Sequence, residues 1–220
     1  MFLFFLFILL FGWISGFVVG LGNIYWLSAW PILLIAYWIA FKEIKELDKQ
    51  RLKLRKGAVG EAVVSFILES FPADFRVMHD LCTGYGNLDH VVIGPTGVFV
   101  IDAKNWRGVI TADGNDEILL NGKPSDKPVV KNLTRNIMSV REKVKTLSNL
   151  DTYFHGLLVF TSALVEANWG TTGSIHCMKD EQLYDYIVED KKGKTLSEKE
   201  IDSISQAFLA LARMDKGFAE

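Results

Sequence analysis

The chain has 220 residues, which is enough for one ordinary domain and an appendage. Its net charge of −2 points to no particular partner. The two cysteines, Cys82 and Cys177, cannot supply a four-ligand zinc site, and no CxxC motif accompanies them. These counts exclude a structural zinc site built from cysteines and fit a reducing compartment, while a disulfide between the two cysteines stays open.

Charge is distributed unevenly along the chain. Residues 1–41 carry no charged side chain, residues 42–56 hold seven basic and three acidic residues, and residues 57–220 have a net charge of −6. A helix rises about 1.5 Å per residue, so about 20 residues cross a ~30 Å hydrocarbon core. We therefore predict a transmembrane hairpin over residues 1–41, with helices at Met1–Val19 and Ile24–Phe41 and a turn at Gly20–Asn23.

The basic segment 42–56 predicts the orientation of this hairpin. Basic residues favour the cytoplasmic side, so we expect an integral, two-pass protein of the cell membrane with its soluble domain in the cytoplasm. A cleaved signal peptide followed by one anchor is the alternative, but residues 1–11 lack a basic region and no small-x-small cleavage site follows. We interpret residues 42–56 as a juxtamembrane linker and helical spacer that contacts lipid headgroups, with DNA binding as the alternative.

The elements expected in the soluble part alternate between helices and strands. The apolar spacing predicts helices over 56–69, 129–147, 181–188 and 197–213, and strands over 75–79, 88–93, 98–103, 109–112, 117–120, 156–161 and 175–178. Both faces of Val98–Ala103 are apolar, which is typical of a sheet covered on both sides. We predict an α/β domain over residues 57–178, with C-terminal helices in 179–220 packed on it.

Two neighbouring strands carry the candidate chemistry. If Gly94–Gly97 is a four-residue turn, Ile93 faces Val98 and Asp89 stands opposite Asp102. Opposed residues of antiparallel strands have Cβ atoms roughly 4.5–5.5 Å apart, close enough for both carboxylates to share one cation. A hard divalent ion, Mg²⁺ or Mn²⁺, suits such ligands and removes their repulsion. Side chains alternate along a strand, so Lys104 lies on the same face, ready to bind a phosphate oxygen or lower the pKa of an attacking water, whereas His90 points to the opposite face.

The alternative, non-functional interpretation is a structural salt bridge of Lys104 with its neighbours. Acid-x-Lys triplets occur four times in this chain, beginning at Glu43, Asp102, Glu189 and Asp190, so the triplet alone is weak. Only the Asp102 triplet lies in an apolar strand with an opposed aspartate. This setting favours a functional site for metal-assisted phosphodiester hydrolysis.

These motifs resemble a known family. Gly60-Glu61, the run from Asp89 to Lys104, and Asn105-Trp106-Arg107-Gly108 closely resemble the NERD (nuclease-related) domain, itself related to the PD-(D/E)XK group of restriction-endonuclease-like enzymes. The resemblance covers about residues 56–162. It implies a mixed central β-sheet flanked by helices, and an active site at Glu61, Asp89, Asp102 and Lys104. Family members often carry a glutamine on the following helix, where this chain has Asn136 as a candidate auxiliary residue.

Candidate nucleic-acid contacts follow the active-site strands. Residues 123–145 hold seven basic residues against two acidic ones, so this segment could follow a phosphate backbone or form a solvated helix face. Our candidates for nucleic-acid contacts are Arg107, Lys131 and Arg135. Trp106 could stack on a base, but we favour packing at the end of the sheet.

Two classes of function remain open. One is a membrane-anchored, Mg²⁺-dependent nuclease that hydrolyses DNA on the cytoplasmic side. The other is a non-catalytic, membrane-tethered module that uses the same fold to bind nucleic acid or a protein, because a family resemblance does not guarantee activity.

Overall fold

The computed structural model describes residues 25–83, 86–167, 175–189 and 195–216. The chain divides into two compact units, Met1–Lys53 and Leu54–Glu220. The second unit contains every strand of the structure, in two sheets. It therefore contains the whole candidate site.

A five-stranded mixed sheet forms the centre of this unit. Its strands are β1 (Arg76–Cys82), β2 (Asn87–Gly94), β3 (Gly97–Lys104), β7 (Phe154–Phe160) and β9 (Ile175–Lys179), and they lie in this order across the sheet. Pairs β1–β2 and β2–β3 are antiparallel, whereas β3–β7 and β7–β9 are parallel. The mixed α/β fold is therefore confirmed.

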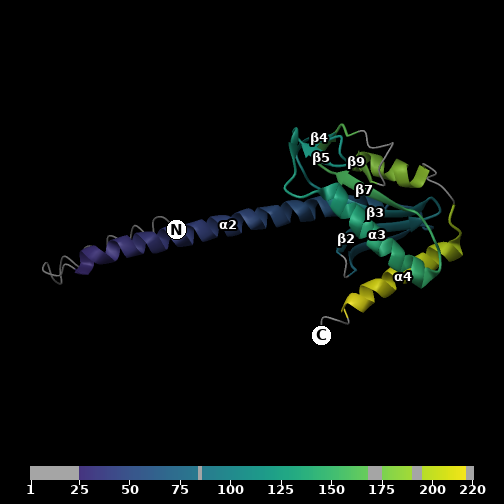
Figure 1. The fold of residues 1–220 in the computed structure, drawn as a ribbon, viewed down its shortest axis with the longest axis horizontal. Coiled ribbons are helices and arrows are strands. Elements are labelled where there is room, and N and C mark those ends of the chain that lie inside the picture. The colour runs from purple at the N-terminus through teal and green to yellow at the C-terminus, as the bar shows by residue number, and fades with distance from the viewer. Residues whose placement is uncertain (1–24, 84–85, 168–174, 190–194, 217–220) are drawn as a thin grey trace. The chain divides into compact units, whose positions relative to one another are not determined.

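One face of this sheet carries the side chains of Val91, Ile93, Val98 and Val100, and we call it the carboxylate face because Asp102 and Lys104 continue the same alternation along β3. Helices α3 (Val129–Ser148) and α4 (Glu198–Lys216) pack on this face (Figure 1). They bury an apolar stripe each, formed by Val130, Leu133, Ile137, Val140 and Val144 in α3 and by Ile201, Ile204, Ala207, Phe208 and Leu211 in α4.

The opposite face is covered by the last turns of α2 (Tyr25–Leu68) and by the segment after β9. Val64 and Leu68 of α2 pack on Phe99, Ile101 and Ala103. A 3₁₀ turn (η1, Asp180–Gln182) and a π-helical turn (η2, Asp185–Glu189) lie where we expected one helix over 181–188, and Leu183 and Ile187 are buried in this second core.

A second, four-stranded sheet continues from the first. Its strands β4 (Gly108–Ala112), β5 (Ile118–Leu120), β6 (Lys123–Pro124) and β8 (Ala163–Val165) lie in the order β6-β5-β4-β8. Along the chain, β4 follows β3 and β8 follows β7. Strands β3 and β7 are parallel neighbours in the first sheet, and β4 and β8 are parallel neighbours in the second. The two short strands β6 and β8 were missed in the sequence, because two or three residues carry no readable alternation.

Most expected elements occur within a few residues of their predicted bounds. The helix expected over 197–213 begins one residue later, at Glu198, with a capping box: Ser197 N donates to Glu200 Oε2 at 2.8 Å, and Glu200 N donates to Ser197 Oγ at 3.4 Å. The helix expected over 56–69 is instead the end of α2, which also includes the basic segment 42–56 and most of the second predicted membrane helix.

The predicted transmembrane hairpin is not supported. No helix within the described ranges is long and apolar enough to cross a membrane. The first predicted membrane helix and the turn at Gly20–Asn23 lie outside the described residues.

Candidate metal and nucleic-acid site

The hairpin of β2 and β3 has the predicted register. Gly94 pairs with Gly97, Ile93 with Val98, and the ladder continues to His90 opposite Ile101. One step further, Ala103 N donates to Asp89 Oδ2 at 3.0 Å, so the aspartate side chain accepts a backbone hydrogen bond at the end of the ladder. The carboxyl group of Asp89 is also near enough to that of Asp102 to raise the pKa of Asp102. The structure thus brings the two predicted carboxylates together.

Burial decides the protonation of Asp102. Loss of solvent raises its pKa from 3.8 to about 6, Lys104 opposes this shift, and the neighbouring Asp89 carboxylate adds to it. Two carboxyl groups in contact cannot both ionise at low cost unless a cation lies close to them. The pair therefore holds a proton in acid and has the electrostatics of a cation site above pH 6.

Lys104 supplies part of the positive charge that two neighbouring carboxylates need. Its ammonium group forms an ion pair with Asp102 Oδ1, and both side chains are partly buried, with exposed fractions of 24% for Lys104 and 22% for Asp102. Such a pair is what a structural salt bridge requires. It also places a hydrogen-bond donor beside the carboxylates, where a phosphate oxygen would need one.

Glu61, which the family resemblance implies as an active-site residue, belongs to a helix that packs on the other face of the sheet. Val64 and Leu68 of α2 lie in the core on the face opposite the carboxylates. The neighbouring Gly60 lies against Asn105, just after the end of β3, where a Cβ atom would come within 3.0 Å of Asn105 Cβ. Glu61 is half-buried there.

His90 points away from the carboxylate face, as predicted. It is only 2% exposed, and its Nδ1 atom lies 2.8 Å from Nδ1 of His79, so one ring donates to the other. Its Nε2 atom is buried and finds no hydrogen-bond partner within the described part of the chain. Burial and His79 lower the pKa of His90 to about 4, so this histidine is neutral at pH 7.

Asn136 of α3 reaches the loop before β2. The side-chain amide lies so close to Gly86 that a Cβ atom there would come within 2.8 Å of Nδ2. Gly86 also has a φ of 140° and accepts a hydrogen bond from Thr83 Oγ1 at 2.9 Å. Asn136 therefore contacts the turn that leads into Asp89, a contact that no sequence pattern indicated.

The chain passes from the first sheet to the second just after the ends of β3 and β7, next to the site. Ser162 Oγ donates to Asn105 Oδ1 at 2.6 Å, which joins the segment after β3 to the segment after β7. Trp106 packs on Phe160 with ring centroids 5.8 Å apart and joins the core of the carboxylate face. Its packing role is thereby favoured over base stacking. Arg107, the next residue, is exposed.

Four of the seven basic residues in segment 123–145 form two pairs, one in each half of α3. Arg141 and Lys145, in the second half of α3, form ion pairs with Asp151 at 2.7 Å and 2.8 Å. In the first half, Lys131 and Arg135 are exposed, and the only described contact of either side chain is that of Arg135 with Asn132. Since Asn136 lies beside Gly86, this first half is near the end of the sheet that carries Asp89.

The carboxylate donors fit a hard divalent ion. Mg²⁺ is commonly held by one or two carboxylates, with waters and substrate phosphates completing its ligands. Asp89 and Asp102 supply such a pair, although no group of three or more His, Cys, Asp or Glu with metal-binding geometry occurs within the described residues. The site therefore suits an ion that shares its ligands with a substrate and not a closed protein cage.

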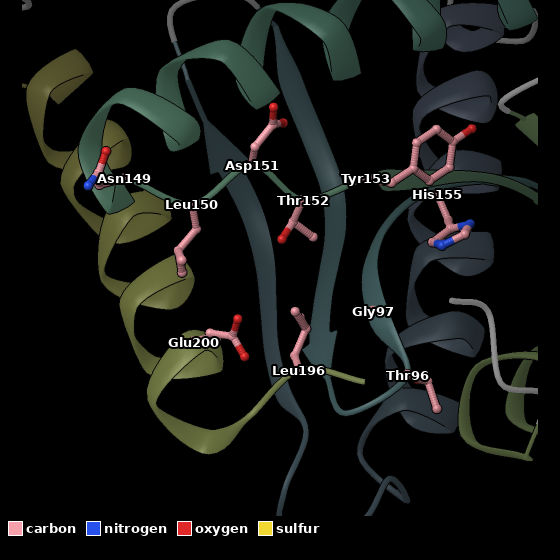
Figure 2. A pocket seen from close by; sticks show the side chains of 10 residues that line it. All are labelled: Thr96, Gly97, Asn149, Leu150, Asp151, Thr152, Tyr153, His155, Leu196 and Glu200. Carbon is pink, nitrogen blue, oxygen red and sulfur yellow. The ribbon is translucent and has the colours of Figure 1, made fainter. Parts of the chain in front are cut away.

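A cavity of about 360 Å³ lies at the other end of β3, beside Gly97 (Figure 2). Its two acidic side chains come from the loop after α3 and from the first turn of α4 (Figure 2). Both are already bound, since Asp151 pairs with Arg141 and Lys145, and Glu200 accepts hydrogen bonds from Ser197. Because the cavity lies at the other end of β3, it is separate from the carboxylate pair.

Comparison with known proteins agrees with this geometry. Residues 56–161 match the family described as the nuclease-related domain, NERD. The match identifies residues 56–161, just under half of the chain, as a region similar to the NERD domain. The matched region begins in the last turns of α2 and ends just after β7, so it contains Asp89, Asp102, Lys104 and Asn136.

Two individual proteins are similar to parts of this chain. The uncharacterized protein pXO1-01 of Bacillus anthracis is 35% identical over 85 residues, which cover 36% of this chain and 39% of that protein. The structure of Pyrococcus furiosus SfsA in complex with Ca²⁺ is 12% identical with a TM-score of 0.23, covering 73% of this chain and 54% of that one. The chain thus spans well under two thirds of either protein.

Proposed function

We propose that the chain is a divalent-metal-dependent nuclease that hydrolyses phosphodiester bonds in DNA. The observation that carries the proposal is the closeness of Asp89 and Asp102 within the region similar to the NERD domain, with the ammonium group of Lys104 beside them. Asp89 and Asp102 would hold Mg²⁺ or Mn²⁺. The bound ion would polarise the phosphoryl group and lower the pKa of an attacking water.

The other residues of the proposed site act on the substrate or on its position. Lys104 would donate to a phosphate oxygen and stabilise the negative charge that develops there. Asn136 would hold the turn at Gly86. Arg107, Lys131 and Arg135, all exposed, would contact the phosphate backbone. Glu61 would need a side-chain or helix movement to join the ligands, so we assign it a lesser role.

Cleavage of plasmid and branched DNA by the full-length chain tests this proposal. We expect cleavage that requires Mg²⁺ or Mn²⁺ and falls at least 100-fold in Asp102→Ala and in Lys104→Ala, because the ion and the donor each contribute several kcal/mol to such reactions. Asp202→Asn, which removes an exposed acid paired with Arg76, is the matched control and should retain activity. Undiminished cleavage in both site variants would exclude the carboxylate pair as the active site.

A non-catalytic binding module is the second candidate. It is favoured by the ion pair of Lys104 with Asp102, which a purely structural role would also explain. The two functions differ in one result: the module would bind DNA with an affinity that does not depend on the metal and would leave every phosphodiester bond intact.

Membrane attachment is a separate part of the proposal. It is supported by the 41 uncharged residues at the start of the chain and the basic segment that follows them. We infer that this part anchors the protein to the inner face of the cell membrane. Fractionation of cells that express the chain with a C-terminal tag tests it: the protein should remain in the membrane pellet after a carbonate wash, and recovery in the supernatant would contradict the anchor.

A further inference from the structure

One residue of β1, Asp80, lies outside the usual strand conformation. Its φ is 52°, in the left-handed region that favours glycine. A residue with a Cβ atom stays in this region only where the surrounding structure holds it there, and such residues gather at functional sites. Asp80 is exposed, so burial of its side chain is not what holds it. The contacts of β1 with β2 therefore carry the explanation.

The register of β1 and β2 places Asp80 opposite Asp89. The residues before and after these aspartates are paired, His79 with His90 and Leu81 with Leu88. The two aspartates themselves are not paired, although every residue of both strands is described. The ladder is therefore open at Asp89, one of the two residues that we assign to the metal site.

Both strands also change face at this point. Residues three apart on a regular strand point to opposite faces, because side chains alternate. In β1, Met78 and Leu81 nevertheless pack in the same core, the one on the carboxylate face. In β2, Leu88 and Val91 do the same. Each strand therefore turns over once within the two residues between them, and in β1 this interval contains Asp80.

The turnover of β2 gives the Asp89 side chain its direction. The ladder of β2 and β3 stops at His90 and Ile101. Beyond it, Ala103 N donates to Asp89 Oδ2 at 3.0 Å. A regular strand holds its side chains roughly perpendicular to the sheet, where an aspartate does not reach the backbone of the next strand. The Asp89 carboxylate therefore lies along the sheet, toward β3 and Asp102.

Asn87 ties the two strands together at the same place. Its Nδ2 atom donates to Asp80 Oδ1 at 3.2 Å, so a residue two positions before Asp89 holds the side chain of the left-handed residue. Aspartate and asparagine enter the left-handed region more readily than other residues with a Cβ atom. The identity of residue 80 therefore fits the conformation that it adopts.

We propose that Asp80 is a positioning residue for Asp89. The left-handed conformation of Asp80 keeps the ladder of β1 and β2 open, so β2 can turn over and direct the Asp89 carboxylate to Ala103 N and toward Asp102. A β-branched residue at position 80 would favour the regular strand conformation and a closed ladder, which would turn this carboxylate away. This inference rests on the proposed function, in which Asp89 holds the metal ion, but the position of Asp89 can be measured without any metal.

Amide hydrogen exchange of Ala103, followed by NMR on the full-length chain in EDTA, reports the bond to Asp89. Asp80→Val should make this amide exchange about 10-fold faster than in the wild type, the scale of one lost hydrogen bond. Asp80→Asn and Asp80→Gly, which accept a positive φ, should keep the wild-type rate within about 3-fold. All three variants remove the charge of Asp80, so only the backbone preference of the new residue separates them.

Asp116→Val is the matched control for a general loss of stability. Asp116 is also an exposed aspartate with a positive φ, 61°, but it lies in the loop between β4 and β5, and its replacement should leave the exchange of Ala103 unchanged. Asp80→Ala is the milder change to use if Asp80→Val does not fold, and it should also accelerate the exchange. Equal rates in Asp80→Val and Asp80→Gly, or an equal effect of Asp116→Val, would overturn the proposal.

Calorimetric titration of the same variants with Mn²⁺ extends the test to the metal site. Asp80→Val should bind the ion at least about 10-fold more weakly than Asp80→Asn, because residues that orient a metal ligand commonly contribute that much to affinity. Equal affinities would overturn the role of Asp80 in the site and leave the proposed metal site intact. If Mn²⁺ does not bind the wild type, the metal-dependent function fails, whereas the exchange of Ala103 still decides whether Asp80 positions Asp89.

Discussion

The carboxyl group of Asp89 raises the pKa of Asp102, although the backbone ladder between their strands ends one pair earlier, at His90 and Ile101. Asp89 also accepts a hydrogen bond from Ala103 N, so one carboxylate both ends the ladder and acts on its neighbour. The position of Asp89 is therefore held by the backbone of the partner strand. This arrangement makes the pair sensitive to pH and to cations.

Replacement of Asp102 should stabilise the metal-free protein at neutral pH. Burial and Asp89 raise the pKa of Asp102 from 3.8 to about 6, so the stability that its proton provides is complete below pH 4 and lost as pH rises through 6. Asparagine does not titrate, so the Asp102→Asn variant should not lose this stability as pH rises. The difference in unfolding free energy between Asp102→Asn and the wild type should grow in favour of the variant by up to about 3 kcal/mol between pH 4 and pH 7.

Urea unfolding in EDTA at several pH values measures that difference, and added Mg²⁺ supplies the control. Mg²⁺ should stabilise the wild type at pH 7 and leave Asp102→Asn unaffected, because binding to the folded state alone shifts the unfolding equilibrium. A difference that does not change with pH would show that Asp102 titrates normally.

His90 should make the protein sensitive to acid. Burial, with a smaller contribution from His79, lowers its pKa from 6.5 to about 4. The stability that depends on its neutral form is complete above pH 6.5 and lost as pH falls through 4. Between pH 6.5 and 4, the wild type should lose up to about 3 kcal/mol of unfolding free energy through His90. His90→Gln should not show this loss when both proteins are unfolded in urea. Parallel pH profiles for the two proteins would contradict this assignment.

Lys131 and Arg135 should bind DNA, whereas Lys145 should not. Lys131 and Arg135 are exposed in the half of α3 near the site, but Lys145 is paired with Asp151 at the other end. Lys131→Ala with Arg135→Ala should reduce the slope of log K against log salt by about 1.8 for duplex DNA. Lys145→Ala is the matched loss of one charge on the same helix and should leave the slope unchanged. A fall of about 0.9 in the Lys145→Ala variant, half that of the double change, would favour a diffuse solvated surface.

Gly108 should be intolerant of any side chain. Its φ is 126°, and a Cβ atom would lie 2.3 Å from Oδ1 of Asn121, the atom that accepts a hydrogen bond from Val109 N. Gly108→Ala should cost about 2–4 kcal/mol through strain and the lost bond. Gly122→Ala is the control, because Gly122 has a φ of 73° but open space around it, and it should cost only about 1 kcal/mol. Thermal unfolding of both variants measures the difference, and equal costs would show that Asn121 moves aside freely.

Local patterns predicted most of the sheet and the pairing of its central strands. The register of β2 and β3 follows from one four-residue turn, since a tight reversal leaves no freedom in which residues face each other. The bounds of α2 were not predictable in this way. A change from apolar to basic composition at residue 42 suggested a boundary, but a helix needs only continued backbone hydrogen bonding, and composition does not interrupt it.

The sequence by itself determined the NERD resemblance and the alternation that places Asp102 and Lys104 on one face, because strand periodicity depends on backbone geometry alone. Tertiary packing decided the rest. It placed α2, and with it Glu61, over the opposite face, because the buried side of that helix is set by which apolar stripe the sheet accepts. It also brought Asn136 to Gly86, since contacts between distant segments depend on how all the apolar faces are covered together.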